Sequence, residues 1–471
     1  MKGRRQKIFD KAETCPQKNR TASEGYAGGQ TFLWITENNL TEPENRKENG
    51  LLESILSPAN LNAAYKRVKS NKGAAGVDKM EVDSLKDYLV NHKDAQISSI
   101  LRGKYRPHPT RRVLIPKGNG KQRQLGIPTV VDRVIQQSIS QQLSLIYEPQ
   151  FSDHSYGFRP RRSAHQAVQK CQQYITEGYI HAVDMDLERF FDTVVHGKLI
   201  EVLSRTIKDG RVVSLIHKYL NAGVIQQDGR FGETLEGVPQ GGPLSPLLGN
   251  VLLNELDWEL ERRGHKFVRY ADDLVILCKS KRGAERTMKS ITSYIEEKLF
   301  LKVNRNKTKV AYIRDIQFLG YSFYRYKGEC RLRVHSKSVE KMKARIRELT
   351  SRSNGWGNEC RKTALNQYIT GWVQYFKLAD IKTLLTTTDA WLRRRLRMVI
   401  WKQWKRIRTK VANLVKLGIN RYKAYEWANT RKGYWHVANS FILSRTVTDE
   451  RLRKAGYVFF SDYYKTVRVK C

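Results

Sequence analysis

The amino-acid sequence predicts an α/β fold that is followed by an all-helical, basic region. Up to about residue 330, strand-like apolar runs alternate with segments whose apolar residues recur at helical spacing. After about residue 335 the pattern is purely helical, which places a domain boundary near 331–340. Lys and Arg number 86 against 46 Asp and Glu, so the formal net charge is +40.

The N-terminal third predicts a leader, helices and a hairpin. Residues 1–50 are polar and low in aliphatic side chains, which is typical of a flexible leader. Residues 51–100 have helical spacing, with Pro58 between two short helices. In 111–128, the turn signal Asn119-Gly120 joins two alternating arms, and Thr129 suits the N-cap of the helix that follows.

The middle of the chain predicts more strands and helices in alternation. A buried strand runs into a short helix over 179–194, and a Gly/Pro turn opens a helix over 237–257, with Ser245 as N-cap and Pro246 as the first helical residue. Strands are expected over 267–277 and 316–326, with a helix between them at 284–301. Beyond the boundary, four apolar residues share one helical face: Leu365, Ile369, Trp372 and Phe376.

The charge imbalance indicates a polyanionic partner, because self-repulsion opposes the compaction of so basic a chain. Basic residues interleaved with Trp and Tyr favour a nucleic-acid surface. A membrane surface is the competing interpretation, but the sequence shows no amphipathic anchor and no apolar run of membrane-spanning length. Six cysteines without a C-x-x-C pair predict reduced thiols, and with no visible signal peptide the expected location is the bacterial cytoplasm.

Two adjacent carboxylates, Asp272 and Asp273, interrupt the apolar run "FVRYADDLVIL" at 267–277. Buried carboxylates are costly unless they are paired or hold a metal. Asp186 ends another apolar run, so three acids on adjoining strands would suit Mg²⁺, and two such ions can clamp a displacement at phosphorus. The alternative is an Asp-rich turn on a solvated sheet edge, which would be preferred for an isolated Asp-Asp pair.

The ordered motifs resemble those of group II intron-encoded reverse transcriptase/maturases. The resemblance covers roughly residues 55–410, and the "YADD" at 270–273 looks like the family's catalytic hairpin. The matching blocks are "NKGAAGVD" (71–78), "IPKGNGKQRQLGIPTVVDRVIQQ" (115–137), "SYGFRPRRSAHQA" (155–167), "VDMDLERFFDTV" (183–194), "GVPQGGPLSPLLGNVLLNELD" (237–257), "LKVNRNKTKV" (301–310), "FLGYSF" (318–323) and "LNQYITGWVQYF" (365–376). The resemblance implies a right-hand polymerase, with fingers and palm over 51–330 and a helical thumb or maturase domain X over 331–410.

The family pattern implies roles for individual residues. Its first catalytic Asp precedes an aromatic residue by five positions, which selects Asp186 with Phe191 and rejects Asp184. The resemblance thus makes Asp186, Asp272 and Asp273 the catalytic metal ligands. Phe191 would be a steric gate against a ribose 2′-OH, or else an ordinary core residue.

Five further residues are implied to contact the nucleotide. Lys117 and Arg123 would close on the triphosphate, unless they belong to a solvated hairpin tip. Gln240 and Gly241 resemble the floor under the nascent base pair, or a bare glycine turn. Lys307 would protonate the leaving pyrophosphate, or be a surface lysine.

Other family features receive weaker assignments. "FLGYSF" resembles the primer grip, or an edge strand, and Arg159 and His154 are structural or phosphate contacts without firm assignment. Val195 and Gly197 stand where the family often has Asn and Asp, and Phe300 replaces a common Gly. No paired cysteines of a His-Asn-His endonuclease are present, which resembles the short class of the family.

The segment 391–410 carries nine basic residues and no acid. Such a charge run predicts phosphate contacts and salt-sensitive binding. The predicted nucleic-acid contacts are Arg393, Arg394, Arg395, Arg397, Lys402 and Lys405. The interspersed Trp391, Trp401 and Trp404 either pack in the core or stack on unpaired bases.

Together these features predict an RNA-directed DNA polymerase of a group II intron that also binds the intron RNA and assists its splicing and mobility. Its expected partners are intron RNA, an RNA template with a DNA primer, and deoxynucleoside triphosphates, with two Mg²⁺ ions or Mn²⁺ as cofactors; residues 411–471 are expected to be a basic nucleic-acid-binding segment. The alternatives are a reverse transcriptase recruited to defence or DNA repair, and an RNA-binding splicing cofactor with a dispensable polymerase. The oligomeric state stays open.

Overall fold

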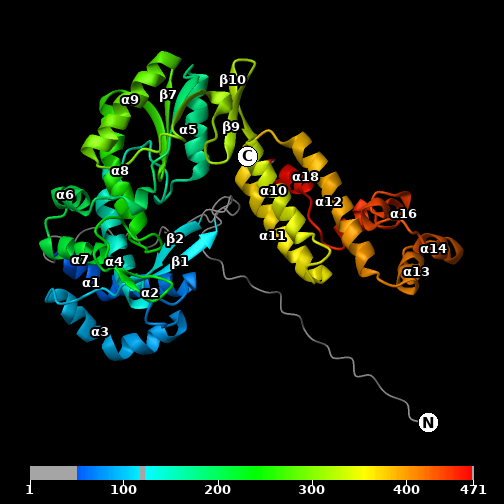
Figure 1. Ribbon diagram of the computed structural model, residues 1–471, viewed down its shortest axis with the longest axis horizontal. Coiled ribbons are helices and arrows are strands. Elements are labelled where there is room, and N and C mark those ends of the chain that lie inside the picture. The colour runs from blue at the N-terminus through cyan, green and yellow to red at the C-terminus, as the bar shows by residue number, and fades with distance from the viewer. Residues whose placement is uncertain (1–49, 117–121, 469–471) are drawn as a thin grey trace, which may run out of the picture. The chain divides into compact units, whose positions relative to one another are not determined.

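A computed structural model describes residues 50–116 and 122–468 (Figure 1). The described chain divides into two compact units, one ending at Leu332 and one beginning at Arg333. The division falls inside the interval 331–340, and residues 333–410 and 411–468 share one unit. No helix within the described ranges is both long and apolar enough to cross a membrane.

The first part of the larger unit is mainly helical and carries a small mixed sheet. Its strands follow the order β2-β1-β4-β5, with β1 antiparallel to β2 and parallel to β4. The elements are α1 (Leu51–Leu56), α2 (Pro58–Asn71), α3 (Leu85–Leu101), β1 (Thr110–Pro116), β2 (Gln122–Ile127), α4 (Val130–Tyr147), α6 (His196–Thr206), α7 (Gly210–Leu220), β4 (Val224–Ile225) and β5 (Phe231–Gly232).

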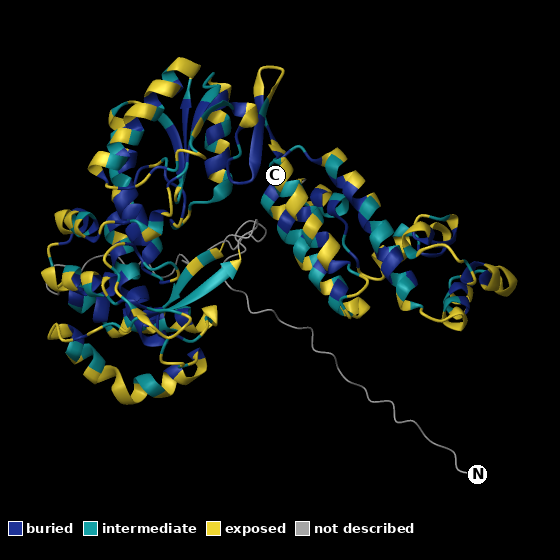
Figure 2. Cartoon of the chain, in the orientation of Figure 1, coloured by how far each residue is buried: buried dark blue, intermediate teal, exposed yellow. Residues whose placement is uncertain are grey.

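The other part of the larger unit is built on an antiparallel sheet with the order β6-β7-β3-β8. Helices α8 and α9 supply apolar residues to the core beneath it, and exposed residues follow the outer faces of the helices (Figure 2). The elements are α5 (Ala164–Thr176), β3 (His181–Met185), the 3-10 turn η4 (Phe190–Asp192), α8 (Ser245–Arg262), β6 (Lys266–Tyr270), β7 (Asp273–Cys278), α9 (Lys281–Lys298), β8 (Lys309–Tyr312), the 3-10 turn η5 (Ile313–Asp315), β9 (Tyr321–Tyr326) and β10 (Glu329–Val334).

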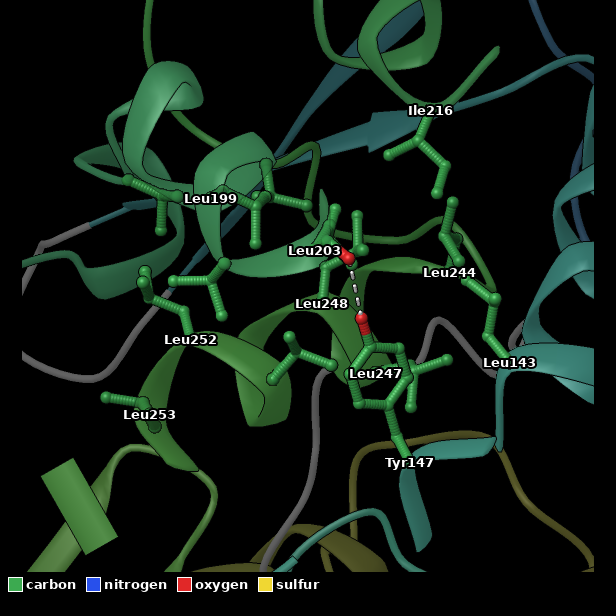
Figure 3. Packing of buried hydrophobic residues seen from close by; sticks show 14 of the residues in the cluster. Leu143, Tyr147, Leu199, Leu203, Ile216, Leu244, Leu247, Leu248, Leu252 and Leu253 are labelled. Carbon is green, nitrogen blue, oxygen red and sulfur yellow. Dashed lines mark hydrogen bonds between the residues drawn. The ribbon is translucent and has the colours of Figure 1, made fainter. Parts of the chain in front are cut away.

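The core joins the two parts of this unit through α8. Figure 3 shows leucines of α8 packed against apolar residues of α4, α6 and α7, where the Tyr147 hydroxyl donates to the Leu203 carbonyl at 3.3 Å. The labelled residues of this cluster are Leu143, Tyr147, Leu199, Leu203, Ile216, Leu244, Leu247, Leu248, Leu252 and Leu253. Each fully buried aliphatic side chain contributes about 1.5–3 kcal/mol through the hydrophobic effect, so α8 is a rigid support for the residues that it carries.

The smaller unit is all-helical from α10 onward. The predicted face of Leu365, Ile369, Trp372 and Phe376 is confirmed, since all four side chains are buried. The helices are α10 (Ser336–Leu349), α11 (Asn358–Phe376), α12 (Lys382–Gln403), α13 (Ile407–Lys416), α14 (Arg421–Ala428), α15 (Tyr434–Val437), α16 (Phe441–Thr446), α17 (Asp449–Lys454) and α18 (Phe460–Arg468).

The predicted start of a helix was right in one case and shifted by one residue in another. Thr129 caps α4 as expected, because its side-chain oxygen accepts from the Asp132 amide at 3.2 Å. Ser245 is instead the first residue of α8, and its hydroxyl donates to the Pro239 carbonyl at 2.6 Å, so the predicted cap was one residue late. The two helices expected around Pro58 are found, since α1 ends at Leu56 and Pro58 is the first residue of α2.

Two other expectations need correction. The strand predicted over 316–326 begins only at Tyr321, because Leu319 and Gly320 both have positive φ and end the extended conformation. The expectation of six reduced cysteines is wrong at Cys360, which is disulfide-bonded, whereas Cys171, Cys278 and Cys330 are free.

Candidate active site

The two adjacent carboxylates lie at the hairpin between β6 and β7, as predicted. Tyr270 pairs with Asp273 across this hairpin, so Ala271 and Asp272 form a two-residue turn and Asp273 starts β7. Ala271 has a φ of +57°, whereas Asp272 is not among the residues with positive φ. A positive φ at the first turn position alone is typical of a type II′ hairpin turn.

The sheet register places Asp186 next to Asp273. Met185 pairs with Leu274 on the antiparallel neighbour β7, so the next positions along the two strands are Asp186 and Asp273. Directly opposed residues in such a pair have Cβ atoms about 4.5–5.5 Å apart and share one face of the sheet. The register therefore brings together two of the three predicted metal ligands from positions 87 residues apart in the chain, and Asp272 adjoins them in the turn.

The same register continues to Lys307 on the other side of Asp186. Asp184 pairs with Lys309 on β8, so Asp186 faces Lys307, and the lysine Nζ lies 3.0 and 3.1 Å from the two carboxylate oxygens. Both side chains keep contact with solvent, at 32% exposure for Asp186 and 64% for Lys307. One row across the sheet thus reads Tyr270, Asp273, Asp186 and Lys307.

The acids of this row point away from the apolar core. Met185 and Leu274 belong to that core, and successive strand residues point to opposite faces. Asp184, Asp186 and Asp273 therefore share the other face. Strand alternation explains how a buried sheet carries these carboxylates.

The donor set fits a hard divalent cation, because carboxylate oxygens are the ligands that Mg²⁺ prefers. Within the described ranges, no three His, Cys, Asp or Glu side chains are gathered closely enough to form a metal site, and the Asp186 carboxylate is paired with the Lys307 ammonium. A cation of the chain therefore neutralises the carboxylate that a metal would otherwise share. A metal at Asp186 would compete with the Lys307 ammonium for these two oxygens.

The pKa of Asp184 is raised, because burial disfavours the charged form of its carboxyl group. Burial raises the pKa of Asp184 to about 6, a shift that the Lys309 ammonium partly offsets and the charge of Asp186 increases. A raised carboxyl pKa means that the folded state binds the proton more tightly than the unfolded state. Stability is therefore highest below the unfolded pKa, near 3.8, and is lost as the pH rises through about 6.

We expect Asp184→Asn to stabilise the metal-free fold at pH 8 by at most about 3 kcal/mol, since it removes an ionised carboxylate from a partly buried site. The gain should shrink between pH 6 and pH 4, where the wild-type carboxyl becomes protonated. Urea unfolding in the presence of a chelator measures both free energies of unfolding. An equal gain at pH 4 and pH 8 would contradict the raised pKa.

Phe191 lies in η4, just after β3. Its ring meets that of Phe190 edge-on at a centroid distance of 5.0 Å, and Ala271 and Gly249 line the same small recess. A Cβ added to Gly249 would lie 3.1 Å from both phenylalanine rings, so this glycine of α8 gives the rings their room. Phe191 is only partly buried, which leaves part of the ring able to contact a ligand.

Arg123 and Gln240, predicted separately as nucleotide contacts, are joined by a hydrogen bond. The Arg123 Nε donates to the Gln240 Oε1 at 2.9 Å, and the Gly126 amide donates to the Gln240 carbonyl at 2.8 Å. Gly241 has a φ of +124°, and a Cβ there would lie 2.7 Å from the Gly126 carbonyl oxygen, so only glycine fits. Lys117 lies outside the described residues.

The glycine turn is also tied to the loop that carries Phe191. The Val238 amide donates to the Phe191 carbonyl at 2.6 Å, and the His196 ring nitrogen Nε2 lies 2.7 Å from the Gly237 carbonyl oxygen. The unusual residues around His196 therefore form an ordered junction. Similarly, Phe300 has a φ of +56°, the conformation that explains a common glycine at its position.

Arg159 and His154, which the sequence left without a firm role, have structural contacts. The buried Arg159 guanidinium forms an ion pair with Glu148 at 2.8 Å and donates to the carbonyls of Ser152 and Ser155. Nδ1 of the half-buried His154 ring lies 3.2 Å from the Tyr174 hydroxyl, and burial lowers its pKa. Both residues thus shape the loop that precedes Gly157.

The arginines of α12 have partners inside the smaller unit. Arg393 and Arg397 both pair with Asp449 at 3.1 Å, and Arg395 donates to the Thr350 hydroxyl at 2.5 Å. Arg394 stacks on the Trp435 ring at 4.0 Å and donates to its carbonyl. These guanidinium groups connect helices, which is a role that the charge run did not predict.

The lysines and tryptophans of the same segment differ from the arginines in their exposure and in their contacts. Lys405 is exposed, and the Lys402 ammonium lies 5.2 Å above the Tyr434 ring. Trp401 is fully buried, as the core interpretation expected, and Trp391 and Trp404 are partly buried. Phosphate binding by the six basic residues stays a prediction, with Lys405 the most accessible of them.

Comparison with known proteins gives the class of this molecule. Residues 115–323, which include the acidic row and the glycine turn, match the family model "Reverse transcriptase (RNA-dependent DNA polymerase)". Residues 339–418 of the helical unit match the model "Group II intron, maturase-specific domain". The fold and the site therefore define a polymerase of the reverse transcriptase class, an enzyme class that uses divalent metal ions.

Individual relatives make the assignment more specific. The chain is 35% identical over 336 residues to Protein YkfC of Escherichia coli K12, covering 62% of this chain and 88% of YkfC. It is 32% identical over 338 residues to the group II intron-encoded protein LtrA of Lactococcus lactis, covering 58% of this chain and 56% of LtrA. The putative COX1/OXI3 intron 2 protein of Saccharomyces cerevisiae is 27% identical over 445 residues, covering 75% of this chain and 51% of that protein.

The chain belongs to the group II intron-encoded reverse transcriptase/maturase family, whose enzymes are RNA-directed DNA polymerases. It spans little more than half the length of LtrA and of the yeast intron protein.

Proposed function

We propose that this chain copies an RNA template into DNA at the acidic row of the larger unit. The observation that carries the proposal is the register that sets Asp273 beside Asp186, with Asp272 in the adjoining turn. In the proposed reaction the 3′-hydroxyl of a DNA primer attacks the α-phosphate of a deoxynucleoside triphosphate. The bond between the α- and β-phosphates breaks, and pyrophosphate leaves.

The three aspartates would hold two Mg²⁺ ions, for which Mn²⁺ is a substitute. When bound, such ions lower the pKa of the attacking hydroxyl and stabilise the charge of the leaving pyrophosphate. Lys307, once released from Asp186, is placed at the end of the row, where its ammonium would donate a proton to the leaving group. Arg123 and Lys117 would neutralise the triphosphate, and Gln240 would hold Arg123 in place.

A second proposed role is binding of a group II intron RNA, which assists its splicing and mobility. The match to the maturase-specific domain and the net charge of +40 support this role. Accessible groups for RNA in the helical unit include Lys405 and the aromatic Tyr422, whose side chain is 81% exposed. Lysine neutralises phosphates, and an exposed ring can stack on an unpaired base.

Replacing Asp272 with alanine tests the two roles separately. Asp272 is exposed in the turn, so Asp272→Ala should fold, lose Mg²⁺-dependent primer extension on an RNA template and still support splicing of its intron RNA. Both activities are measured on the same preparation, with its thermal midpoint as the control for folding. Near-wild-type extension by Asp272→Ala would refute the polymerase site, and wild-type protein without effect on splicing would refute the RNA role.

A further inference from the structure

One ion pair behind the catalytic turn is almost completely removed from solvent. Arg269 on β6 is 1% exposed and Asp257 on α8 is 0% exposed. The Arg269 Nε lies 2.8 and 3.0 Å from the two Asp257 oxygens, and Nη2 lies 2.5 Å from one of them. Replacing a buried ion pair by apolar residues of similar volume is often neutral or stabilising, so fold stability alone does not account for this pair.

The third nitrogen of the same guanidinium contacts the turn. Arg269 Nη1 donates to the Ala271 carbonyl at 3.0 Å and to the Asn250 side-chain oxygen at 2.9 Å. Asn250 also lies on α8, and its Nδ2 donates to the Gly157 carbonyl at 2.8 Å. The planar fork of the arginine therefore links α8, the turn and the loop behind it through one rigid group.

The loop at Gly157 also contacts the turn and the strand that leads into it. The Tyr156 amide donates to the Arg269 carbonyl, and the Arg269 amide donates to the His154 carbonyl, both at 2.9 Å. A Cβ added to Gly157 would lie 2.2 Å from the Ala271 nitrogen and 2.9 Å from the Tyr270 carbonyl carbon. The backbone of this loop therefore lies directly against the turn.

Ala271 itself has the conformation that needs such support. A φ of +57° is costly for a residue with a side chain and persists only where the surroundings determine it. Here the carbonyl of Ala271 is held by Arg269 and its nitrogen is backed by Gly157. The residue in this conformation immediately precedes the two aspartates.

We propose that Arg269, held by Asp257 and Asn250, is a positioning residue that fixes the Ala271 carbonyl and thereby aims the Asp272 and Asp273 carboxylates. This inference rests on the proposed function, because it gives those carboxylates the role of metal ligands. The function of the buried network is then to hold the carboxylates of the site in a fixed position. A lysine at 269 can keep the charge pair with Asp257 but has one point donor in place of the fork, so it cannot hold Asp257, Asn250 and Ala271 at once.

Arg269→Lys tests the proposal with several readouts. We expect kcat for primer extension to fall about 10–100-fold, because a displacement of about 1 Å at reacting groups has an effect of this size. The KM for deoxynucleotide should change less than threefold. The Mg²⁺ concentration for half-maximal activity should rise severalfold, and Mn²⁺ binding measured by EPR without substrate should weaken by a similar factor.

The matched control is Arg361→Lys in the helical unit. Arg361 is 2% exposed and, like Arg269, donates to a backbone carbonyl, that of Trp356 at 3.0 Å, and to an asparagine side-chain oxygen, that of Asn354 at 3.1 Å. It shares the burial of Arg269 and two of its partner types, the backbone carbonyl and the asparagine side chain, but it belongs to the other unit. Arg361→Lys should lower the thermal midpoint and leave the Mn²⁺ affinity unchanged.

Gly157→Ala tests the same proposal without touching the ion pair, and it decides the matter if Arg269→Lys does not fold. The added methyl group must displace the Ala271 backbone or the loop, so the same weakening of Mn²⁺ binding is expected. A folded Arg269→Lys or Gly157→Ala with wild-type Mn²⁺ affinity and kcat would overturn the proposal. If instead wild-type extension does not depend on Asp272, the proposed function fails and not merely the role of Arg269.

Discussion

Replacing Asp186 with asparagine is expected to lower the rate of primer extension at least about 10³-fold while the protein stays folded. Asn is nearly isosteric with Asp, so the end of β3 should keep its conformation, but one negative charge of the metal-binding set is lost. Removing one electrostatic group that stabilises a transition state lowers the rate about 10²–10³-fold. Loss of a ligand that two ions share weakens the binding of both ions. The rate is measured by single-nucleotide incorporation at saturating substrate and Mg²⁺.

Asp94→Asn is the matched control for this substitution. Asp94 is an exposed aspartate on α3, far along the chain from the acidic row, and the same chemical change there should alter the rate by less than twofold. Asp186→Asn also removes the ion pair with Lys307, which is solvent-exposed and so contributes little to stability. An Asp186→Asn protein that retains more than a tenth of the wild-type rate would exclude Asp186 as a metal ligand.

Replacing Phe191 with valine is expected to reduce discrimination against ribonucleotides by about 10–100-fold. The ring has little freedom, because Phe190 packs edge-on against it and Gly249 of α8 backs both rings. A rigid ring that contacts the nucleotide sugar would exclude a ribose 2′-hydroxyl by steric clash, and specificity of this kind rests on what the site rejects. The measurement is the ratio of kcat/KM for a deoxynucleotide to that for the matching ribonucleotide.

Phe190→Leu separates this effect from loss of packing. Phe190 is 3% exposed and belongs to the apolar core, so truncating its ring should cost stability without changing the discrimination ratio. If Phe191→Val keeps the wild-type ratio of kcat/KM values, Phe191 is an ordinary core residue and not a steric gate. An equal loss of discrimination in both variants would show that the packing of the pair, and not the Phe191 ring itself, sets the ratio.

The acids themselves were predictable from sequence because their environment is distinctive. Asp272 and Asp273 interrupt an apolar strand run, and Asp186 ends another, and carboxylates in such apolar surroundings indicate a cation. Their register was not predictable. The sheet order β6-β7-β3-β8 inserts β7 between β6 and β3, and only this pairing sets Asp186 between Asp273 and Lys307.

Contacts between residues far apart in the sequence account for the remaining differences between the sequence-based predictions and the structure. The arginine run on α12 reads as a free basic face, yet Arg393 and Arg397 pair with Asp449, about fifty residues further along the chain. Arg269 carried no signal of its own within the hairpin run, because its partners Asp257 and Asn250 are defined by the packing of α8 on β6. Periodicity reports which face of an element is buried, and it does not report which polar groups meet there.

The convergence of the three aspartates on a pair of cations is tested most directly by crystallography of the protein with Mn²⁺, a primer–template duplex and a non-reacting deoxynucleotide analogue. The account predicts two anomalous peaks about 3.5–4 Å apart, with oxygens of Asp186 and Asp273 bound to them and the Lys307 ammonium withdrawn from Asp186. A duplex and nucleotide bound at the row with Asp186 still paired to Lys307, and no manganese at its oxygens, would contradict it.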